Sequence, residues 1–316
     1  MPIDDKKEAA MELGRRLAEA TLARMRAAQA TRAKALEANS ARLEVRTQVT
    51  GPGSMLGTAN HQSTGFLVAL GDSWFDYPFH DVLKSLDHSY GYDIESAAHR
   101  GDRIESMAYT GGQVDQFAYC LEKVLNHGIE PKAVLLSGGG NDIVADDFGM
   151  LINSALSPIA GWNTGIVNGI IGERVFISYY CLITQINAVC MDRLNHVLPI
   201  VIHGYDYMVP DGRGVLGGWG PLPGPWLKPG FHDKSFNDLP ANLLLMHDLI
   251  DTLNTTLSAI ASDPSLGDVR YLDLRGTLNS DLTAKAYKSS WANELHPSAD
   301  GFEALAASFA YLLGNL

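Results

Sequence analysis

The chain has 316 residues, a formal net charge of −12 and a pI near 5.2. Its hydrophobic content of 46% and charged content of 19% are typical of a folded globular protein and exclude an intrinsically disordered chain. The negative charge argues against nucleic acid or an anionic membrane as the main partner. This length is sufficient for one large domain with a full core, or for one domain and an appendage.

Residues 1–46 are rich in Ala, Arg, Glu and Lys, which favour helix, and contain a single glycine. Their apolar residues keep neither a heptad nor a wide apolar face, so we expect an exposed helical arm that packs partly on the body or on another subunit. A homo-oligomer formed through this arm is therefore one expectation. The arm has no apolar segment of the secretory type, which makes the cytoplasm the default location. Residues 47–65, with Gly51-Pro52-Gly53-Ser54, are predicted to be a linker.

From residue 66 to 316, apolar strand-like runs alternate with helical segments. Strands are predicted near 66–72, 92–97, 133–138, 199–204 and 269–274, and helices near 78–88, 112–127, 178–197, 240–262 and 298–313. Five strands joined by helical crossovers predict an α/β fold, a three-layer α/β/α doubly wound five-stranded parallel sheet with an N-terminal helical extension.

Two long insertions interrupt this alternation, near 148–177 and 204–240. The first is apolar but carries Asn163, Asn168, Glu173 and Arg174, which argues against a membrane span. The second is rich in Pro, Gly and aromatic residues (Tyr205, Tyr207, Trp219, Trp226 and Phe231). Because loops of this length are usually functional or disordered, the insertions are predicted to shape a substrate pocket, and capping of the sheet edge is the alternative.

Four short blocks carry candidate chemistry. Gly71-Asp72-Ser73-Trp74 ends the first apolar run, Gly101 lies in Ala98–Arg103 after the second, and Asn141 follows the glycines after the third. The fourth block, Trp291–Pro297, contains His296. Serine becomes a nucleophile when a base removes its proton, and histidine suits that task near neutral pH. Each block also has a structural interpretation: a turn at Gly101, a helix N-cap at Asn141, a surface residue at His296.

In this order and spacing, the blocks resemble those of the SGNH hydrolases, the Gly-Asp-Ser esterase and lipase superfamily, over roughly Phe66 to the C-terminus. The resemblance implies a flavodoxin-like SGNH fold, with Ser73 as nucleophile and His296 as base. It also implies an oxyanion hole made of the Ser73 and Gly101 N–H groups and the Asn141 amide. The implied activity is hydrolysis of short to medium acyl or aryl esters, small-molecule substrates, through an acyl-enzyme intermediate without cofactor or metal. Carbohydrate O-deacetylation, thioester hydrolysis and an inactive binding protein of the same fold are the alternatives.

One residue departs from the family pattern, which places an Asp three residues before the histidine, where this chain has Asn293. An Asp→Asn change in a Ser-His-Asp site can cost about 10⁴ in kcat, yet an Asn oxygen can accept from the imidazole, as in Cys-His-Asn proteases. Three possibilities follow: Asn293 orients His296, a carboxylate such as Glu294 or Asp273 does so, or the enzyme uses a Ser-His dyad. Asn293 is the favoured catalytic partner.

Three cysteines complete the inventory, Cys120, Cys181 and Cys190, all in apolar helix-like segments. Their spacing matches neither a disulfide framework nor a metal site, so buried free thiols are predicted.

Overall fold

The computed structural model describes residues 2–47, 63–144, 148–215 and 222–316. At its centre is a five-stranded parallel sheet in the order β2–β1–β3–β6–β7. The strands are β1 (Gly65–Leu70), β2 (Tyr92–Ser96), β3 (Ala133–Leu136), β6 (Ile200–His203) and β7 (Val269–Leu272). The predicted doubly wound parallel sheet is confirmed. Strands β3 and β6 are buried along their whole length, because their apolar runs are covered by helices on both faces.

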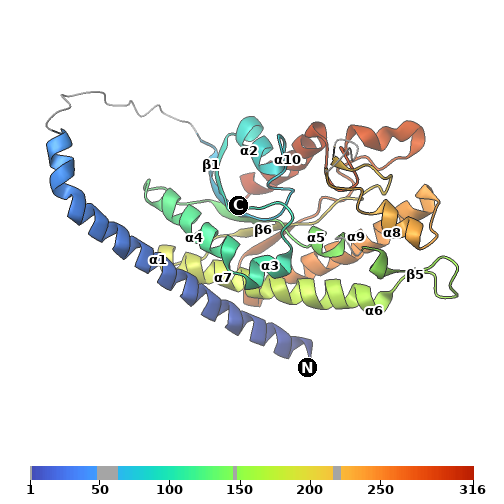
Figure 1. Cartoon of the computed structure of the whole chain (residues 1–316), viewed down its shortest axis with the longest axis horizontal. Helices are drawn as coiled ribbons and strands as arrows, with labels where there is room; N and C mark the ends of the chain where they lie inside the picture. The colour runs from blue at the N-terminus through green and yellow to red at the C-terminus, as the bar shows by residue number, and fades with distance from the viewer. Residues whose placement is uncertain (1, 48–62, 145–147, 216–221) are drawn as a thin grey trace.

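Helices cover both faces of the sheet, which makes three layers (Figure 1). One face carries α2 (Val82–Tyr90) and α10 (Ala299–Gly314), and the other carries α3 (Ile104–Tyr109), α4 (Gly112–Leu125), α7 (Phe176–Leu194) and α9 (Leu239–Ala261). The strand order reverses at β1, which lies between β2 and β3. Open α/β sheets bind ligands in the crevice at such a switch point, beyond the carboxyl ends of the strands.

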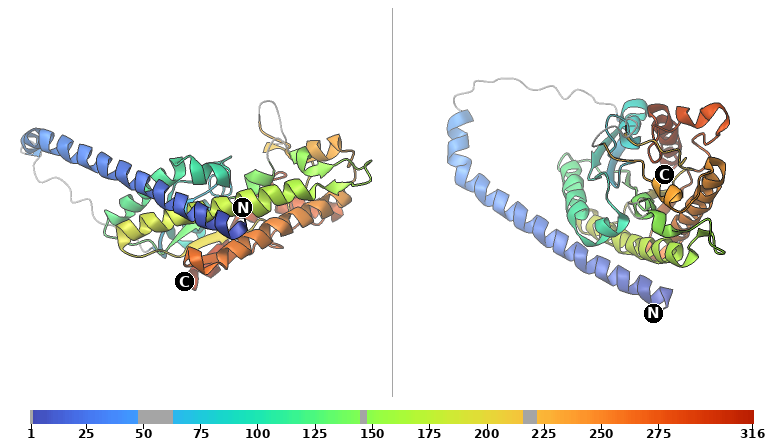
Figure 2. Two further views of the ribbon diagram at one scale, coloured as in Figure 1. Left: turned by 90° about the horizontal axis from the view of Figure 1, so that it is seen from below. Right: turned by 45° about the vertical axis from the view of Figure 1, so that its right-hand side comes forward.

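The N-terminal helix α1 (Ile3–Thr47) crosses outside α4 and α7, as Figures 1 and 2 show. Ala10, Ala18 and Leu22 are buried in this contact. The contact requires a glycine at position 14, because a Cβ there would lie 2.6 Å from the carbonyl oxygen of Cys181. The close approach of the two helices outweighs the cost of about 1 kcal/mol of a glycine in a helix. The predicted helical extension is confirmed, and its first half packs on the body.

Polar contacts fix the same half of α1. The Lys7 ammonium lies 3.0 Å from the Asp263 carboxylate. Asp115 of α4 accepts hydrogen bonds from Thr21 Oγ1 at 2.6 Å and from the Arg24 guanidinium at 2.7 Å. The second half of α1 runs on past the body (Figure 2). Of the predicted linker, residues 48–62 lie outside the described residues.

The two insertions add short elements outside the central sheet. The first contains the 3₁₀-helix η1 (Phe148–Leu151), the strand pair β4 (Ile152–Asn153) and β5 (Gly161–Trp162), helix α6 (Thr164–Val167) and a π-helix η2 (Asn168–Val175) that continues into α7. The second contains α8 (Lys228–Asp233), which packs on η1. The remaining short helices are α5 (Gly140–Ile143), η4 (Pro264–Leu266) and η5 (Thr283–Ser289).

One helical stretch in the described part of the chain, Thr164–Leu194, is long and apolar enough to cross a membrane by length and composition. Half of its most apolar window is buried inside the protein. It packs between α1, α3 and α9 in the manner of a core helix.

Candidate active site

Ser73 lies in a turn directly after β1, at the carboxyl edge of the sheet. The carboxylate of the preceding residue, Asp72, holds this turn: it accepts hydrogen bonds from the Trp74 backbone N–H at 3.0 Å, from Ser137 Oγ at 2.7 Å and from the Tyr205 hydroxyl at 2.5 Å. These donors come from the segments that follow β1, β3 and β6. The position of the Ser73 turn is therefore set by three neighbouring strands.

His296 comes to Ser73 from the far edge of the sheet, in the segment between β7 and α10. Its Nε2 lies 2.9 Å from Ser73 Oγ, and its Nδ1 lies 3.0 Å from Asn293 Oδ1. The same Oδ1 accepts the backbone N–H groups of Leu295 at 3.0 Å and His296 at 2.9 Å. Because backbone N–H groups only donate, this atom of Asn293 is the oxygen, and Nδ1 must carry the imidazole proton. Nε2 is then the unprotonated nitrogen that faces the serine hydroxyl.

The imidazole of His296 is buried between two aromatic rings. Tyr77 stacks on it with ring centroids 4.2 Å apart and planes 18° apart, and Trp226 meets it edge-on at 5.7 Å. The second amide group of Asn293, Nδ2, donates to the Tyr77 hydroxyl at 3.1 Å. Burial lowers the pKa of His296 to about 3, so the ring is neutral at neutral pH. The neutral ring is the form that a general base requires.

The three candidate donors for an oxyanion are the backbone N–H groups of Ser73 and Gly101 and the side-chain amide of Asn141. Among the described residues, none accepts a hydrogen bond from the backbone N–H of Ser73 or of Gly101. Gly101 has φ +85°, a conformation that glycine adopts without strain. Asn141 Nδ2 donates one of its two hydrogens to the Asp102 carbonyl at 2.9 Å, and the other has no acceptor among the described residues. Asn141 is not a helix N-cap, because Gly139 caps α5.

A small cavity adjoins these groups. It is lined by Ser73 and Asn141 together with Asp72, Trp74, Gly140, Val144, Tyr205, Met208 and Leu295. Trp74 therefore lines the same cavity as Ser73. The cavity holds about 10 Å³, which is room for about one water-sized group.

No family model matches the sequence, and no curated protein matches it. Among similar solved structures is an acetylxylan esterase from Geobacillus stearothermophilus, with 15% identity, a TM-score of 0.40, and coverage of 80% of this chain and 95% of that one. A putative GDSL-like lipase from Parabacteroides merdae has 10% identity and a TM-score of 0.42, over 80% of this chain and 97% of the other. A GDSL-like lipase from Bacteroides thetaiotaomicron has 12% identity and a TM-score of 0.37, over 88% and 98%.

Identities and TM-scores this low give no basis for transferring an activity to this chain. An activity can be argued only from the arrangement of its own side chains. The structure brings Ser73, His296 and Asn293 into one hydrogen-bonded row. It also brings Asn141 to the cavity that Ser73 lines. His296 is buried, which rules out the surface interpretation.

The two carboxylates considered as partners of His296 have other contacts. Glu294 is buried and accepts backbone N–H groups from Gly212, Trp226, Leu227 and Lys228 at 2.7–3.0 Å. Burial raises its pKa, and the four hydrogen bonds oppose that shift. Glu294 thus anchors the second insertion to the histidine segment. Asp273 is bonded to Arg275. Within the described chain, neither carboxylate is hydrogen-bonded to His296.

Two residues without a clear signal in the sequence, Gln113 and Asp142, connect the blocks in the structure. Gln113, a buried residue of α4, binds both backbone groups of Gly71, at 3.0 and 2.9 Å, and the Asp102 carboxylate at 2.6 Å. Asp142 accepts the Ile104 backbone N–H at 3.0 Å, and burial raises its pKa to about 6. Together they connect the segments after β1, β2 and β3. For Gln113 the sequence signal was a polar residue on the otherwise largely apolar buried face of α4.

The aromatic residues of the second insertion divide among several places. Tyr205 lines the cavity at Ser73, and Trp226 covers His296. Phe231 packs on Phe148, and Tyr207 stacks on His247. Trp219 lies outside the described residues. Of the aromatic residues in the described part of this insertion, Tyr205 and Trp226 are the two that contact the candidate site.

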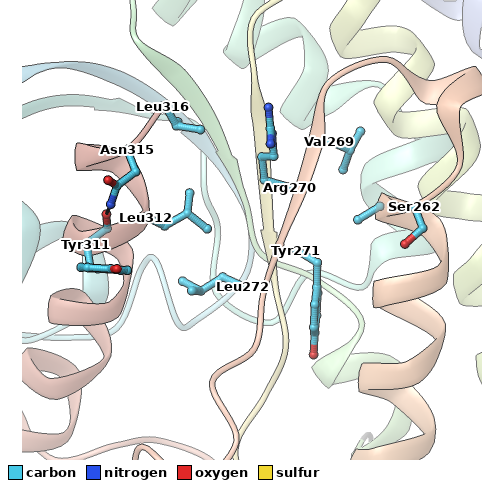
Figure 3. Close-up of a pocket in the computed structure, with 10 residues that line it drawn as sticks. Ser262, Val269, Arg270, Tyr271, Leu272, Tyr311, Leu312, Asn315 and Leu316 are labelled. Atoms are coloured by element: carbon cyan, nitrogen blue, oxygen red, sulfur yellow. Dashed lines mark hydrogen bonds between the residues drawn. The ribbon is translucent and has the colours of Figure 1, made fainter.

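A larger groove runs along the edge strand β7 (Figure 3). Its lining includes Ser262, which follows α9, and Asn315 and Leu316, which follow α10. Helices that run antiparallel to the strands end at the amino edge of the sheet, whereas Ser73 lies at the carboxyl edge. The groove is therefore separate from the candidate active site.

The cysteines are buried free thiols, as predicted. Burial raises the pKa of Cys120 and Cys181 to about 11 and that of Cys190 to about 12, so all three are protonated at neutral pH. Among the residues that the structure describes, no group of three or more His, Cys, Asp or Glu side chains is placed to hold a metal ion.

Proposed function

We propose that this protein is a serine carboxylic ester hydrolase that acts on short to medium acyl or aryl esters through an acyl-enzyme intermediate. The observation that carries the proposal is the row Ser73 Oγ, His296 Nε2, His296 Nδ1 and Asn293 Oδ1, with separations of 2.9 and 3.0 Å. A neutral imidazole whose free nitrogen faces a serine hydroxyl is the arrangement required for nucleophilic attack.

In the proposed reaction, Ser73 Oγ attacks the ester carbonyl carbon while its proton passes to His296 Nε2. The N–H groups of Ser73 and Gly101 and the amide of Asn141 hold the oxyanion that forms. The tetrahedral intermediate collapses, the bond to the leaving alcohol breaks, and His296 returns the proton to that alcohol. Water then attacks the acyl-enzyme with His296 again as base, and the carboxylic acid leaves with Ser73 restored.

The size of the cavity favours the short end of the acyl range. Its apolar walls beside Ser73 are Val144, Met208 and Leu295, all buried. A space for about one water-sized group fits the methyl group of an acetyl ester. A longer acyl chain has to displace the side chain of Val144, Met208 or Leu295.

The test is a fluorophosphonate probe with mapping of the labelled peptide, alongside hydrolysis of p-nitrophenyl acetate. We expect labelling at Ser73 and parallel loss of labelling and hydrolysis in Ser73→Ala. Ser89→Ala, which changes an exposed serine of α2, serves as the matched control and should behave as wild type. Absence of both labelling and turnover in the wild type would reject the proposal and favour a binding protein of this fold.

The acyl range is measured with p-nitrophenyl acetate, butyrate and octanoate. We expect kcat/KM to fall along this series by about tenfold or more, since each extra group has to displace packed side chains. Met208→Ala should raise the butyrate-to-acetate ratio. An unchanged ratio would show that acyl chains bind elsewhere.

A further inference from the structure

Tyr77 has two separate contacts with the catalytic row. Its ring lies flat against the His296 imidazole, at 4.2 Å and 18°. Its hydroxyl oxygen accepts the Asn293 amide N–H at 3.1 Å. One side chain thus touches both the proposed base and the residue that orients the base.

In the part of the chain that the structure describes, the imidazole lacks the neighbouring negative charge that Ser-His-Asp sites place beside it. Asn293 Oδ1 fixes the tautomer, but a neutral amide cannot balance the positive charge that His296 gains when it takes the serine proton. Among the described residues, no carboxylate is hydrogen-bonded to His296. Glu294, the nearest in sequence, is committed to four backbone N–H groups of the second insertion.

An aromatic face can supply part of what the carboxylate would supply. The face of a tyrosine ring is the negative end of its quadrupole, and it attracts a cation within about 6 Å, most strongly where water is excluded. The ring centroids of Tyr77 and His296 lie well inside that limit, and the imidazole is buried. Tyr77 itself is held in place, since its backbone carbonyl accepts the Lys84 ammonium at 2.8 Å and its ring packs on Phe302.

We propose that Tyr77 is a positioning residue for this reaction: its ring stabilises the imidazolium of His296 that forms in the transition state, and its hydroxyl anchors the amide of Asn293. Together Tyr77 and Asn293 take the place of an orienting carboxylate. This inference rests on the proposed esterase function. It assigns to Tyr77 a role that acts through His296 and not through the substrate.

The first test compares Tyr77→Leu and Tyr77→Phe with matched variants at Tyr207, whose ring stacks on His247 at 3.9 Å and 22°. Tyr77→Leu keeps an apolar cover but removes the ring, so kcat for p-nitrophenyl acetate should fall about thirtyfold, the equivalent of about 2 kcal/mol. KM should stay within about twofold, because the cation exists only in the transition state. Tyr77→Phe restores the ring and should recover kcat to within about threefold of wild type. Tyr207→Leu should leave kcat unchanged while it lowers the unfolding temperature.

Equal kcat values for Tyr77→Leu and Tyr207→Leu would overturn the inference. So would a loss confined to KM, which would make Tyr77 part of the substrate wall. Either result differs from failure of the proposed esterase function, which would be indicated by an inactive wild type or by a Ser73→Ala variant that keeps its activity.

A second series guards against misfolding of the leucine variant. Phenylalanine at 77 with one, two or three ring fluorines keeps the shape of the side chain and progressively weakens the negative face of the ring. We expect log kcat to fall stepwise with fluorination. A constant kcat across the series would show that the ring acts by shape alone and would reject the electrostatic role.

Discussion

The protein contains two tyrosine–histidine stacks of nearly the same geometry. Tyr77 lies on His296 at 4.2 Å and 18°, and Tyr207 lies on His247 at 3.9 Å and 22°. Burial lowers the pKa of both histidines. Each tyrosine hydroxyl also has a side-chain partner, Asn293 for Tyr77 and Asp251 for Tyr207.

The two stacks differ in what the imidazole nitrogens contact. Both nitrogens of His296 are engaged, one by Asn293 and the other by Ser73. His247 Nε2 is buried and has no hydrogen-bond partner among the described residues, and nearby carboxylates, Asp251 foremost, oppose the lowering of its pKa. The comparison shows that stacking and burial are common features, whereas a fixed tautomer facing a hydroxyl distinguishes the candidate base.

Replacement of each histidine by alanine gives the largest expected difference. His296→Ala should lower kcat for p-nitrophenyl acetate by about 10⁴-fold or more, because loss of the base leaves only oxyanion stabilisation and binding. His247→Ala should keep kcat within about twofold. The measurement is steady-state kinetics of both variants, after circular dichroism has shown that each variant is folded. A comparable loss in both would mean that the histidine ring supports the fold and not the chemistry.

Asn293→Ala makes His296 resemble His247, with one ring nitrogen unpartnered. The imidazole then loses the acceptor that selects its tautomer, and we expect kcat to fall about 10- to 100-fold. KM should change little, since Asn293 does not face the cavity beside Ser73. An unchanged kcat would show that the Ser-His pair works as a dyad.

Asn293→Asp places a carboxylate beside His296, as Asp251 lies near His247 and opposes the lowering of its pKa. In the wild type the pKa of His296 is lowered to about 3, so the base stays neutral and kcat/KM should remain flat from pH 7 to pH 5. Unfolding free energy should decrease as the pH falls from about 6.5 towards 3, because the unfolded chain binds a proton there that the folded chain does not. A carboxylate at 293 raises the pKa, so the acid limb of kcat/KM should move to higher pH. A wild-type limb already at pH 6.5 would contradict the burial argument.

The sequence could predict the sheet and the four blocks for a physical reason. Buried parallel strands are continuous apolar runs, and functional residues follow directly at their carboxyl ends, as Ser73 follows β1 and Asn141 follows β3. An apolar run and the residues that follow it are adjacent in the sequence, so both can be recognised without knowledge of the packing.

Contacts between distant segments left no such signal. Tyr77 and Asn293 are 216 positions apart, and Gln113 and Gly71 are 42 apart. Nothing in the sequence favoured Asn293 over Glu294 by geometry, because both lie in the same short segment. Only the packed structure separates them, by directing the Glu294 carboxylate to the second insertion and the Asn293 oxygen to the imidazole.

Glu294→Gln should have the smallest effect on kcat. It tests the contribution of Trp226, whose ring meets His296 edge-on and whose backbone N–H binds the Glu294 carboxylate. In the described structure, the Tyr207–His247 stack has no such third ring. The glutamine keeps one acceptor oxygen but turns an amide NH₂ towards backbone N–H groups, so the unfolding free energy should fall by about 1–3 kcal/mol. Since the Glu294 carboxylate binds backbone N–H groups of the second insertion, and in the described structure it is not hydrogen-bonded to the side chain of Tyr77 or Asn293, kcat should stay within about threefold. Glu130→Gln, at an exposed position, is the control for loss of charge. A decrease in kcat as large as that of Asn293→Ala would mean that the Trp226 loop, and not the Tyr77–Asn293 pair, holds the imidazole in its working position.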